Sequence, residues 1–281
     1  MKTPLLQKKN DTSLVKTLAE ATGTISIITF LSRILGLVRG MVIARFFGAG
    51  FATDAFYVAF NLPNFIRRFV AEGSLATTFV PVFSEELARS EDEGRKAFSA
   101  VTTFSLLLTL ATTILGIIFA DELTRLIGYG FGSGSEKSAL TASLMRMMFP
   151  YIILTSLLAL AASVLNTLGY FAVPASTPAI ISGVMILAVV FISPLLMVKI
   201  YSLAAAVLVG GVLALLLSGY LLHRVGFGFF LTSPLFSGAV STISRLMVPV
   251  MLSTSHYPIM VIANRMLASL HQEGRIAVAR A

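Results

Sequence analysis

Three arginines lie deep within the first two apolar stretches of the sequence. Arg33 and Arg39 lie in the first stretch, and Arg67 lies in the second. Near the centre of a bilayer each arginine costs about 2.5–3.5 kcal/mol to insert, so the three together would cost about 8–10 kcal/mol if they faced lipid. We therefore expect all three to face protein or a water-filled cavity. Arg45, near the end of its stretch, is expected to snorkel.

The two arginines of the first stretch project from different faces of a helix. At about 100° per residue, Arg33 shares a face with Gly36 and Gly40, which predicts that a neighbouring helix approaches closely beside the Arg33 guanidinium. Arg39 projects about 120° away from Arg33. One of the two arginines can line a cavity while the other anchors helix packing, and the sequence does not decide which.

The second stretch contains a proline between two asparagines, in the segment Asn61-Leu-Pro-Asn64. Pro63 removes a backbone donor, so we expect a kink at this point with freed carbonyl groups nearby. Asp54, at the start of the same stretch, has two interpretations. It is either the N-cap of the helix or a functional residue.

The charges around Arg67 favour an anionic ligand. Arg68 and Glu72 are four residues apart and can pair with each other, which leaves Arg67 without a partner nearby in the sequence. Glu72 is also the only carboxylate inside an apolar stretch, so the membrane interior is net cationic. Guanidinium groups bind phosphate oxygens in a bidentate fork, which suits a pyrophosphate. A cationic drug would instead need buried acids or an aromatic cage.

The composition identifies the bilayer as the environment that positions these residues. Hydrophobic residues make up 56% of the chain and charged residues 12%, with a mean hydropathy of +0.89, outside the range of soluble domains. Seven apolar runs are long enough to cross a membrane and must be helical, because open backbone in hydrocarbon leaves polar groups unpaired. They cover residues 25–47, 55–83, 101–120, 144–168, 175–198, 201–222 and 246–270.

Several classes of protein are excluded. The net charge of +8 does not indicate nucleic-acid binding, because the basic residues are scattered and form no face interleaved with aromatic residues. The chain has no cysteine, which excludes thiolate metal sites and cysteine nucleophiles. It also has no catalytic triad, paired carboxylates or metal-ligand spacing, so we expect no enzyme activity, no metal and no cofactor.

These observations predict an all-α bundle of transmembrane helices. We expect a cytoplasmic N-terminal segment over residues 1–21, six spans over 22–222, a connector over 223–245, and a seventh span with the beginning of an eighth over 246–281. Lysine and arginine in short loops place the N-terminus and the charged loop 85–96 in the cytoplasm. The loop 121–137 is then periplasmic.

The first two apolar runs resemble the MurJ (MviN) family. The resemblance is carried by Phe30-Leu-Ser-Arg-Ile-Leu-Gly-Leu-Val-Arg39, Ala44-Arg-Phe-Phe-Gly-Ala-Gly50, Thr53-Asp-Ala-Phe56, Asn61-Leu-Pro-Asn64, Arg67-Arg-Phe-Val-Ala-Glu-Gly73 and Phe79-Val-Pro81, with weaker support from Phe149-Pro-Tyr151 and Val164-Leu-Asn166. It implies a member of the multidrug/oligosaccharidyl-lipid/polysaccharide exporter superfamily, with two six-helix lobes around a central cavity and alternating access. Residues 22–222 would then form one complete six-helix lobe, and residues 246–281 the start of a second lobe.

The resemblance also assigns roles to residues. It implies that Arg33, Arg39 and Arg67 bind the substrate's pyrophosphate, and that a gate or portal includes Asp54, Pro63, Asn64 and Glu72. Two features depart from the family pattern. Gly40 stands where the family usually has an acid, and the chain ends before the family's further cavity arginine in its eighth helix.

The resemblance implies a lipid II flippase of the bacterial inner membrane, with a cytoplasmic N-terminus. Its partners would be lipid II or a related undecaprenyl-linked glycan, membrane lipids and an unidentified coupling ion. Two alternatives stay open: a flippase for another undecaprenyl-linked glycan, such as an O-antigen or capsule unit, and a membrane scaffold for cell-wall synthesis that does not transport. A scaffold would bury its arginines in paired contacts, whereas a flippase would leave them wet.

Overall fold

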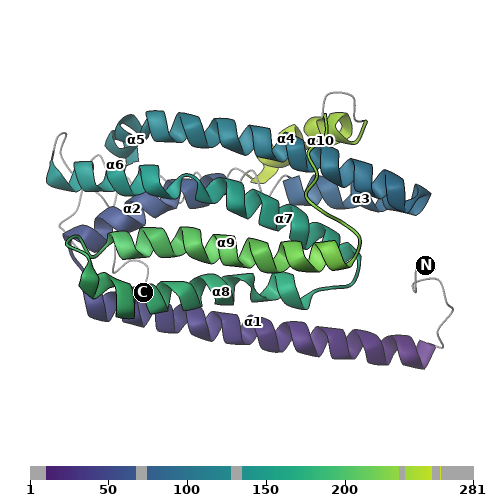
Figure 1. Cartoon of the computed structure of the whole chain (residues 1–281), viewed down its shortest axis with the longest axis horizontal. Helices are drawn as coiled ribbons and strands as arrows, with labels where there is room; N and C mark the ends of the chain where they lie inside the picture. The colour runs from purple at the N-terminus through teal and green to yellow at the C-terminus, as the bar shows by residue number, and fades with distance from the viewer. Residues whose placement is uncertain (1–10, 68–74, 128–134, 234–237, 255–259, 261–281) are drawn as a thin grey trace.

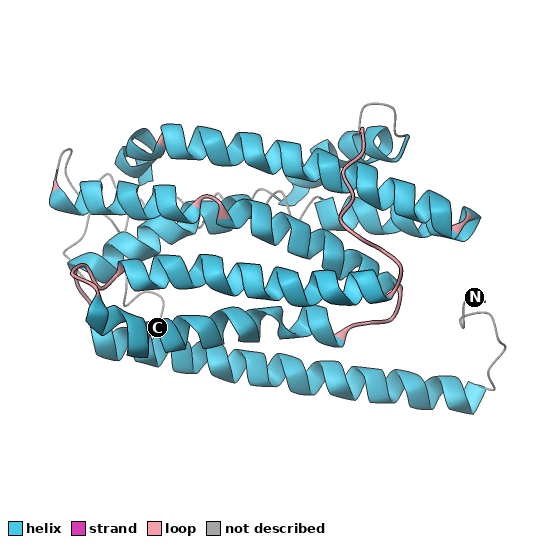
Figure 2. Ribbon diagram, viewed as in Figure 1, coloured by secondary structure: helices cyan, strands magenta, loops and turns pink. Residues whose placement is uncertain are grey.

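The described part of the chain is a bundle of roughly antiparallel helices without a strand (Figures 1 and 2). The computed structural model describes residues 11–67, 75–127, 135–233, 238–254 and 260. The predicted all-α transmembrane fold is therefore confirmed. The helices are α1 Asp11–Phe47, α2 Phe51–Ile66, α3 Ala76–Arg89, α4 Glu91–Ile118, α5 Ala120–Ile127, α6 Glu136–Met148, α7 Tyr151–Thr167, α8 Ala172–Leu187, η4 Ala188–Ile192, η5 Ser193–Leu195, α9 Tyr201–Arg224 and α10 Gly238–Thr254.

Five helical stretches among the described residues are long and apolar enough to cross a bilayer. They are Ile25–Phe47, Glu91–Ile118, Glu136–Thr167, Ala172–Leu195 and Tyr201–Arg224, and they match five of the seven predicted spans. The predicted span 55–83 includes α2 and α3 on either side of residues 68–74, which lie outside the described residues, so the span as a whole stays a prediction. The seventh predicted span, 246–270, begins within α10, whose shorter apolar stretch is Gly238–Ser253. Apart from residue 260, the remainder of this span lies outside the described residues. The six-span lobe stays a prediction.

The helices are stacked in layers that separate the two arginine-bearing elements. Helix α1 packs mainly on α8, and α8 packs on α9. Helix α9 in turn contacts α7 and α6, while α2 packs mainly on α6. In Figure 1, α1 and α8 form one edge of the bundle and α4 the opposite edge. The arginines of α1 and of α2 are therefore held by different neighbours.

The bundle has two apolar cores, one toward each end of α7 and α9. The first core contains Phe56, Phe149 and Tyr151, and the second contains Phe79, Phe98 and the other large side chains around Leu160. Outside these cores, many large apolar side chains of α1 are exposed, including Phe30 and Leu37 at 64% and 65%. Apolar exposure on this scale is unfavourable in water and is typical of a surface that faces lipid or another protein segment.

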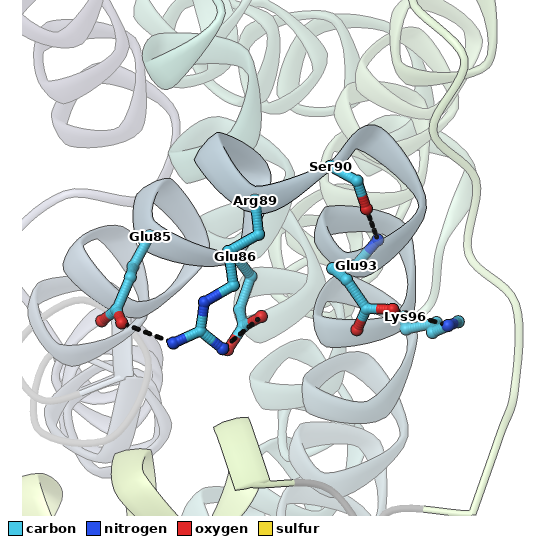
Figure 3. A network of polar contacts seen from close by, with 6 residues as sticks. All are labelled: Glu85, Glu86, Arg89, Ser90, Glu93 and Lys96. Carbon is cyan, nitrogen blue, oxygen red and sulfur yellow. Dashed lines mark hydrogen bonds and ion pairs between the residues drawn. The ribbon is translucent and has the colours of Figure 1, made fainter.

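The charged segment 85–96, expected as a loop, is almost entirely helical. Helix α3 continues to Arg89 and α4 begins at Glu91, so only Ser90 lies between them. The Ser90 hydroxyl accepts a hydrogen bond from the Glu93 N–H at 3.1 Å and caps α4, while Lys96 pairs with Glu93 at 2.7 Å (Figure 3). The expectation was wrong because charges spaced three or four residues apart stabilise helix ends rather than a loop.

The predicted loop 121–137 is also partly helical. Residues 120–127 form α5, and α6 begins at Glu136 behind the N-cap Ser135. Residues 128–134 lie outside the described residues. In Figure 1, α5 and the corner between α3 and α4 lie at opposite ends of α4.

The close helix contact expected at Gly36 and Gly40 is absent from the described structure. No described atom outside α1's own backbone lies within 4 Å of a Cβ built on either glycine. One close contact between helices occurs at Gly210 in α9, where a Cβ would lie 3.0 Å from the Ile181 Cα of α8. Small residues favour helix contact in membranes, but the sequence does not show which glycine has a neighbour.

Candidate functional site

Arg39 is held by α8 through neutral groups. Its side chain is partly buried, and Nη1 donates to the Ser182 Oγ at 3.3 Å and lies 4.0 Å from the Met185 Sδ. Ser182 and Met185 are themselves buried, at 2% and 3% exposed. Arg39 thus contacts α8 and stays partly exposed, so helix packing and cavity lining, which the sequence analysis treated as alternatives, are not exclusive at this residue. Ser182 was not predicted, because nothing in the sequence links positions 143 residues apart.

Arg33 lies on a different side of α1. It is exposed, and within the described residues it makes no hydrogen bond or ion pair. The adjacent Ser32 faces α8 instead, where its hydroxyl is buried and lies 3.4 Å from the Ala175 carbonyl oxygen. Arg33 and Arg39 therefore do not share an environment in the described part of the chain.

Arg67 lies at the C-terminal end of α2 and has a local partner. Its Nε donates to the Asn64 Oδ1 at 2.9 Å, and its backbone N–H donates to the carbonyls of Asn64 and Pro63. The expectation that Arg67 lacks a partner nearby in the sequence was wrong, because the side-chain amide three residues earlier supplies an acceptor on the same helix face. Pro63 is buried inside α2. The predicted pair Arg68–Glu72 lies outside the described residues.

Asp54 is not an N-cap, although it lies in the first turn of α2. The N-cap is Gly50, which makes no side-chain cap, and Asp54 is 1% exposed. The Asp54 Oδ2 lies 3.1 Å from the Nζ of Lys137 on α6, whose side chain is 8% exposed. This buried ion pair was missed because Lys137 was expected in a loop. The available signal was an acid directly before the run 55–83 and a base in the segment that precedes the run 144–168.

The described residues can bind an anion but have no evident means of covalent chemistry. Guanidinium groups offer forked donors that match phosphate oxygens, and the described partners of Arg39 are a hydroxyl and a thioether. Within the described ranges, no three His, Cys, Asp or Glu side chains are grouped as a metal site would require. The arrangement therefore favours recognition of an anionic group over a reaction.

Comparison with known proteins identifies several relatives. The chain is 35% identical over 258 residues to a probable lipid II flippase MurJ of Buchnera aphidicola from Acyrthosiphon pisum, covering 90% of this chain and 50% of that protein. It is 42% identical over 194 residues to the lipid II flippase MurJ of Burkholderia cenocepacia, covering 69% and 38%. The chain thus spans about half the length, or less, of these curated relatives.

Solved structures show the same arrangement of helices. A lipid II flippase MurJ in an inward closed conformation aligns with a TM-score of 0.73 at 29% identity, over 90% of this chain and 52% of that one. A transporter of the MOP superfamily from Pyrococcus furiosus aligns with a TM-score of 0.62 at 18% identity, over 89% of this chain and 62% of that one, which shows likeness of fold alone.

The family follows from the extent of the sequence match. The five long apolar helices and the bacterial relatives together identify a multi-pass protein of the bacterial inner membrane. A sequence model of the family described as lipid II flippase MurJ matches residues 43–280. Because this match covers most of the sequence, the chain belongs to the MurJ family.

Proposed function

We propose that this chain supplies the arginine-bearing part of a flippase that moves lipid II, an undecaprenyl-pyrophosphate-linked glycan, from the cytoplasmic to the periplasmic leaflet by alternating access. The names of its relatives support the substrate. Arg33, Arg39 and Arg67 are proposed to bind the pyrophosphate, and Asp54, Pro63, Asn64 and Glu72 to belong to a gate or portal.

The observation that carries this proposal is the environment of Arg39. A partly buried guanidinium is expensive in a membrane unless an acid or another anion compensates its charge. The described partners of Arg39 are a serine hydroxyl and a methionine sulfur, both neutral. They orient the guanidinium without cancelling its charge, so it can attract an anionic substrate group.

We also propose that the N-terminus is cytoplasmic. The start of α1 and the corner between α3 and α4 lie at one end of the bundle in Figure 1, and α5 and the start of α6 lie at the other. Under the positive-inside rule, the first of these ends is assigned to the cytoplasm. The turn between α1 and α2 is then periplasmic.

The test is complementation of a flippase-depleted strain with full-length variants at matched membrane abundance. Arg39→Ala should abolish growth, because it removes the charge that binds the pyrophosphate. Arg39→Lys should restore growth only partly, because an ammonium keeps the charge but not the planar fork. Arg45→Ala is the matched control: it removes an exposed arginine near the end of the same helix and should leave growth unchanged.

The site assignment would be refuted by normal growth of Arg39→Ala at wild-type abundance. A second readout separates transport from assembly. Accumulation of lipid II in the cytoplasmic leaflet should rise in Arg39→Ala and not in Arg45→Ala. Equal accumulation in both variants would point to a general effect on the membrane and against a binding role for Arg39.

A further inference from the structure

The buried pair between Asp54 and Lys137 joins two helices far apart in the sequence. The Lys137 Nζ lies 3.1 Å from the Asp54 Oδ2, and the two side chains are 8% and 1% exposed. The residues are separated by 83 positions and lie on α6 and α2. Breaking such a pair leaves an uncompensated buried charge, so the two residues depend on each other.

The position of Lys137 is not explained by its own helix. It is the second residue of α6, where the aligned peptide dipoles disfavour a cation and favour an acid. The preceding Glu136 already supplies an exposed acid, and the Ser135 hydroxyl already caps the helix by accepting from the Ser138 N–H at 3.2 Å. Asp54, in contrast, occupies a favourable first-turn position on α2. The lysine is therefore placed to compensate Asp54.

The ion pair fixes one end of the helix that carries Arg67. A second contact holds the same end, because the Thr53 hydroxyl donates to the Gly48 carbonyl at 2.8 Å across the turn from α1. From Asp54 to Arg67 the chain advances 13 residues, or about 20 Å at the rise of an α-helix. A shift of α2 along α6 at its start would therefore move the Asn64–Arg67 contact at its far end.

Apolar packing alone does not specify this register sharply. The Phe56 and Phe60 rings stack on each other within α2, and the tilted contact of Phe60 is with Tyr151 of α7 rather than with α6. Apolar side chains without directional bonds tolerate sliding, whereas a buried ion pair has one favourable alignment. Buried polar groups fix register in other helical assemblies for the same reason.

We propose that Lys137 is a positioning residue for the substrate site: through Asp54 it fixes the register of α2 on α6 and so places Asn64 and Arg67. This inference rests on the proposed function. It makes a selective prediction, because α1 packs on α8. Loss of Lys137 should disturb the α2 side of the site and leave Arg39 on α1 in place.

Thiol labelling can measure this selectivity, since the chain contains no cysteine. Asn64→Cys reports on the far end of α2, and Gly40→Cys, at an exposed position beside Arg39, reports on α1. Each is introduced into the full-length protein alone and together with Lys137→Met. The maleimide reaction rate at Asn64→Cys should change at least threefold in the Lys137→Met background, while the rate at Gly40→Cys should stay within experimental error.

Complementation supplies the second measurement. Lys137→Met should lose growth at matched abundance, and Lys137→Arg, which keeps the charge, should retain it. Exchange of the two charges in Asp54→Lys/Lys137→Asp should restore the Asn64→Cys labelling rate. If Lys137→Met does not accumulate, the exchanged pair decides: a wild-type labelling rate supports the proposal, and an altered rate or failure to accumulate overturns it.

Two other outcomes would also overturn the proposal. One is wild-type growth and labelling in Lys137→Met. The other is an equal change at Asn64→Cys and Gly40→Cys, which would indicate a general folding role. Because labelling requires no substrate, these outcomes are distinct from failure of the proposed function, which is decided by growth of Arg39→Ala.

Discussion

The contact between α8 and α9 at Gly210 should control both stability and the support of Arg39. A Cβ at Gly210 would lie 3.0 Å from the Ile181 Cα. Ile181 immediately precedes Ser182, which accepts the hydrogen bond from Arg39. Because α8 packs between α9 and α1, Gly210→Ala should push α8 toward the helix that carries Arg39.

The size of this effect can be worked from the contact distance. Carbon atoms pack best at about 3.5–4.0 Å, so α8 and α9 would have to separate by about 0.5–1 Å. Overpacking of this kind costs about 1–3 kcal/mol. Replacing a helical glycine by alanine also gains about 0.5–1 kcal/mol through backbone entropy. The gain must be separated from the steric cost.

Gly219→Ala provides the matched control in the same helix. Its Cβ would lie 3.6 Å from the Phe229 Cε2, an ordinary contact, so only the entropic gain applies. The difference in stability between the two variants should therefore equal the steric cost of about 1–3 kcal/mol. We follow thermal unfolding of the full-length protein in detergent by loss of the monodisperse chromatographic peak. The midpoint should be lower for Gly210→Ala than for Gly219→Ala by about 1–3 °C, because the entropy of unfolding grows with chain length. Equal midpoints, or a lower midpoint for Gly219→Ala, would refute the reasoning.

Two further predictions concern Arg67 and the topology. In full-length protein, Arg67→Ala should abolish complementation at near-normal abundance and Arg67→Lys should restore it partly, because lysine cannot form the fork; wild-type growth of Arg67→Ala would remove Arg67 from the site. Cysteines at the exposed positions Asp92 and Glu122 should differ in reactivity toward an impermeant thiol reagent in cells with a permeabilised outer membrane, with Glu122→Cys labelled and Asp92→Cys protected. The reverse pattern would invert the proposed orientation.

Hydropathy predicted the fold because the bilayer imposes a simple constraint. A run of about 20 apolar residues must form a helix to satisfy its backbone, and five predicted runs are helical stretches of this kind. The same reasoning misplaced helix ends. At residues 85–96 it treated charge as a sign of a loop, but Arg89 bonds Glu85 at 2.8 Å and Glu86 at 3.2 Å along α3. Charges end a span in the membrane without ending the helix.

The contacts that position the site could not be predicted from local sequence. Arg39 with Ser182 and Asp54 with Lys137 each join helices more than 80 residues apart. Periodicity gives the direction of a side chain on its own helix, but not the neighbour that it meets. Insertion cost singled out Arg33, Arg39 and Arg67 alike, yet Arg33 is exposed whereas Arg39 contacts α8. The cost carries no information about which helix supplies a contact.

The distribution of acids explains why the α1 arginines can attract an anion. Among the described residues, the buried acid Asp54 is compensated by Lys137, and Asp121 pairs with Arg146 at 2.6 Å. The acids of the α3–α4 corner pair with bases on their own helices. None of these ion pairs reaches α1, so they do not cancel the positive charge of Arg33 and Arg39. The described partners of Arg39, the Ser182 hydroxyl and the Met185 sulfur, are neutral. A substrate anion that entered beside Arg39 would therefore supply the negative charge that balances the guanidinium. Its binding would strengthen as water is excluded, because charge pairs attract more strongly at low dielectric.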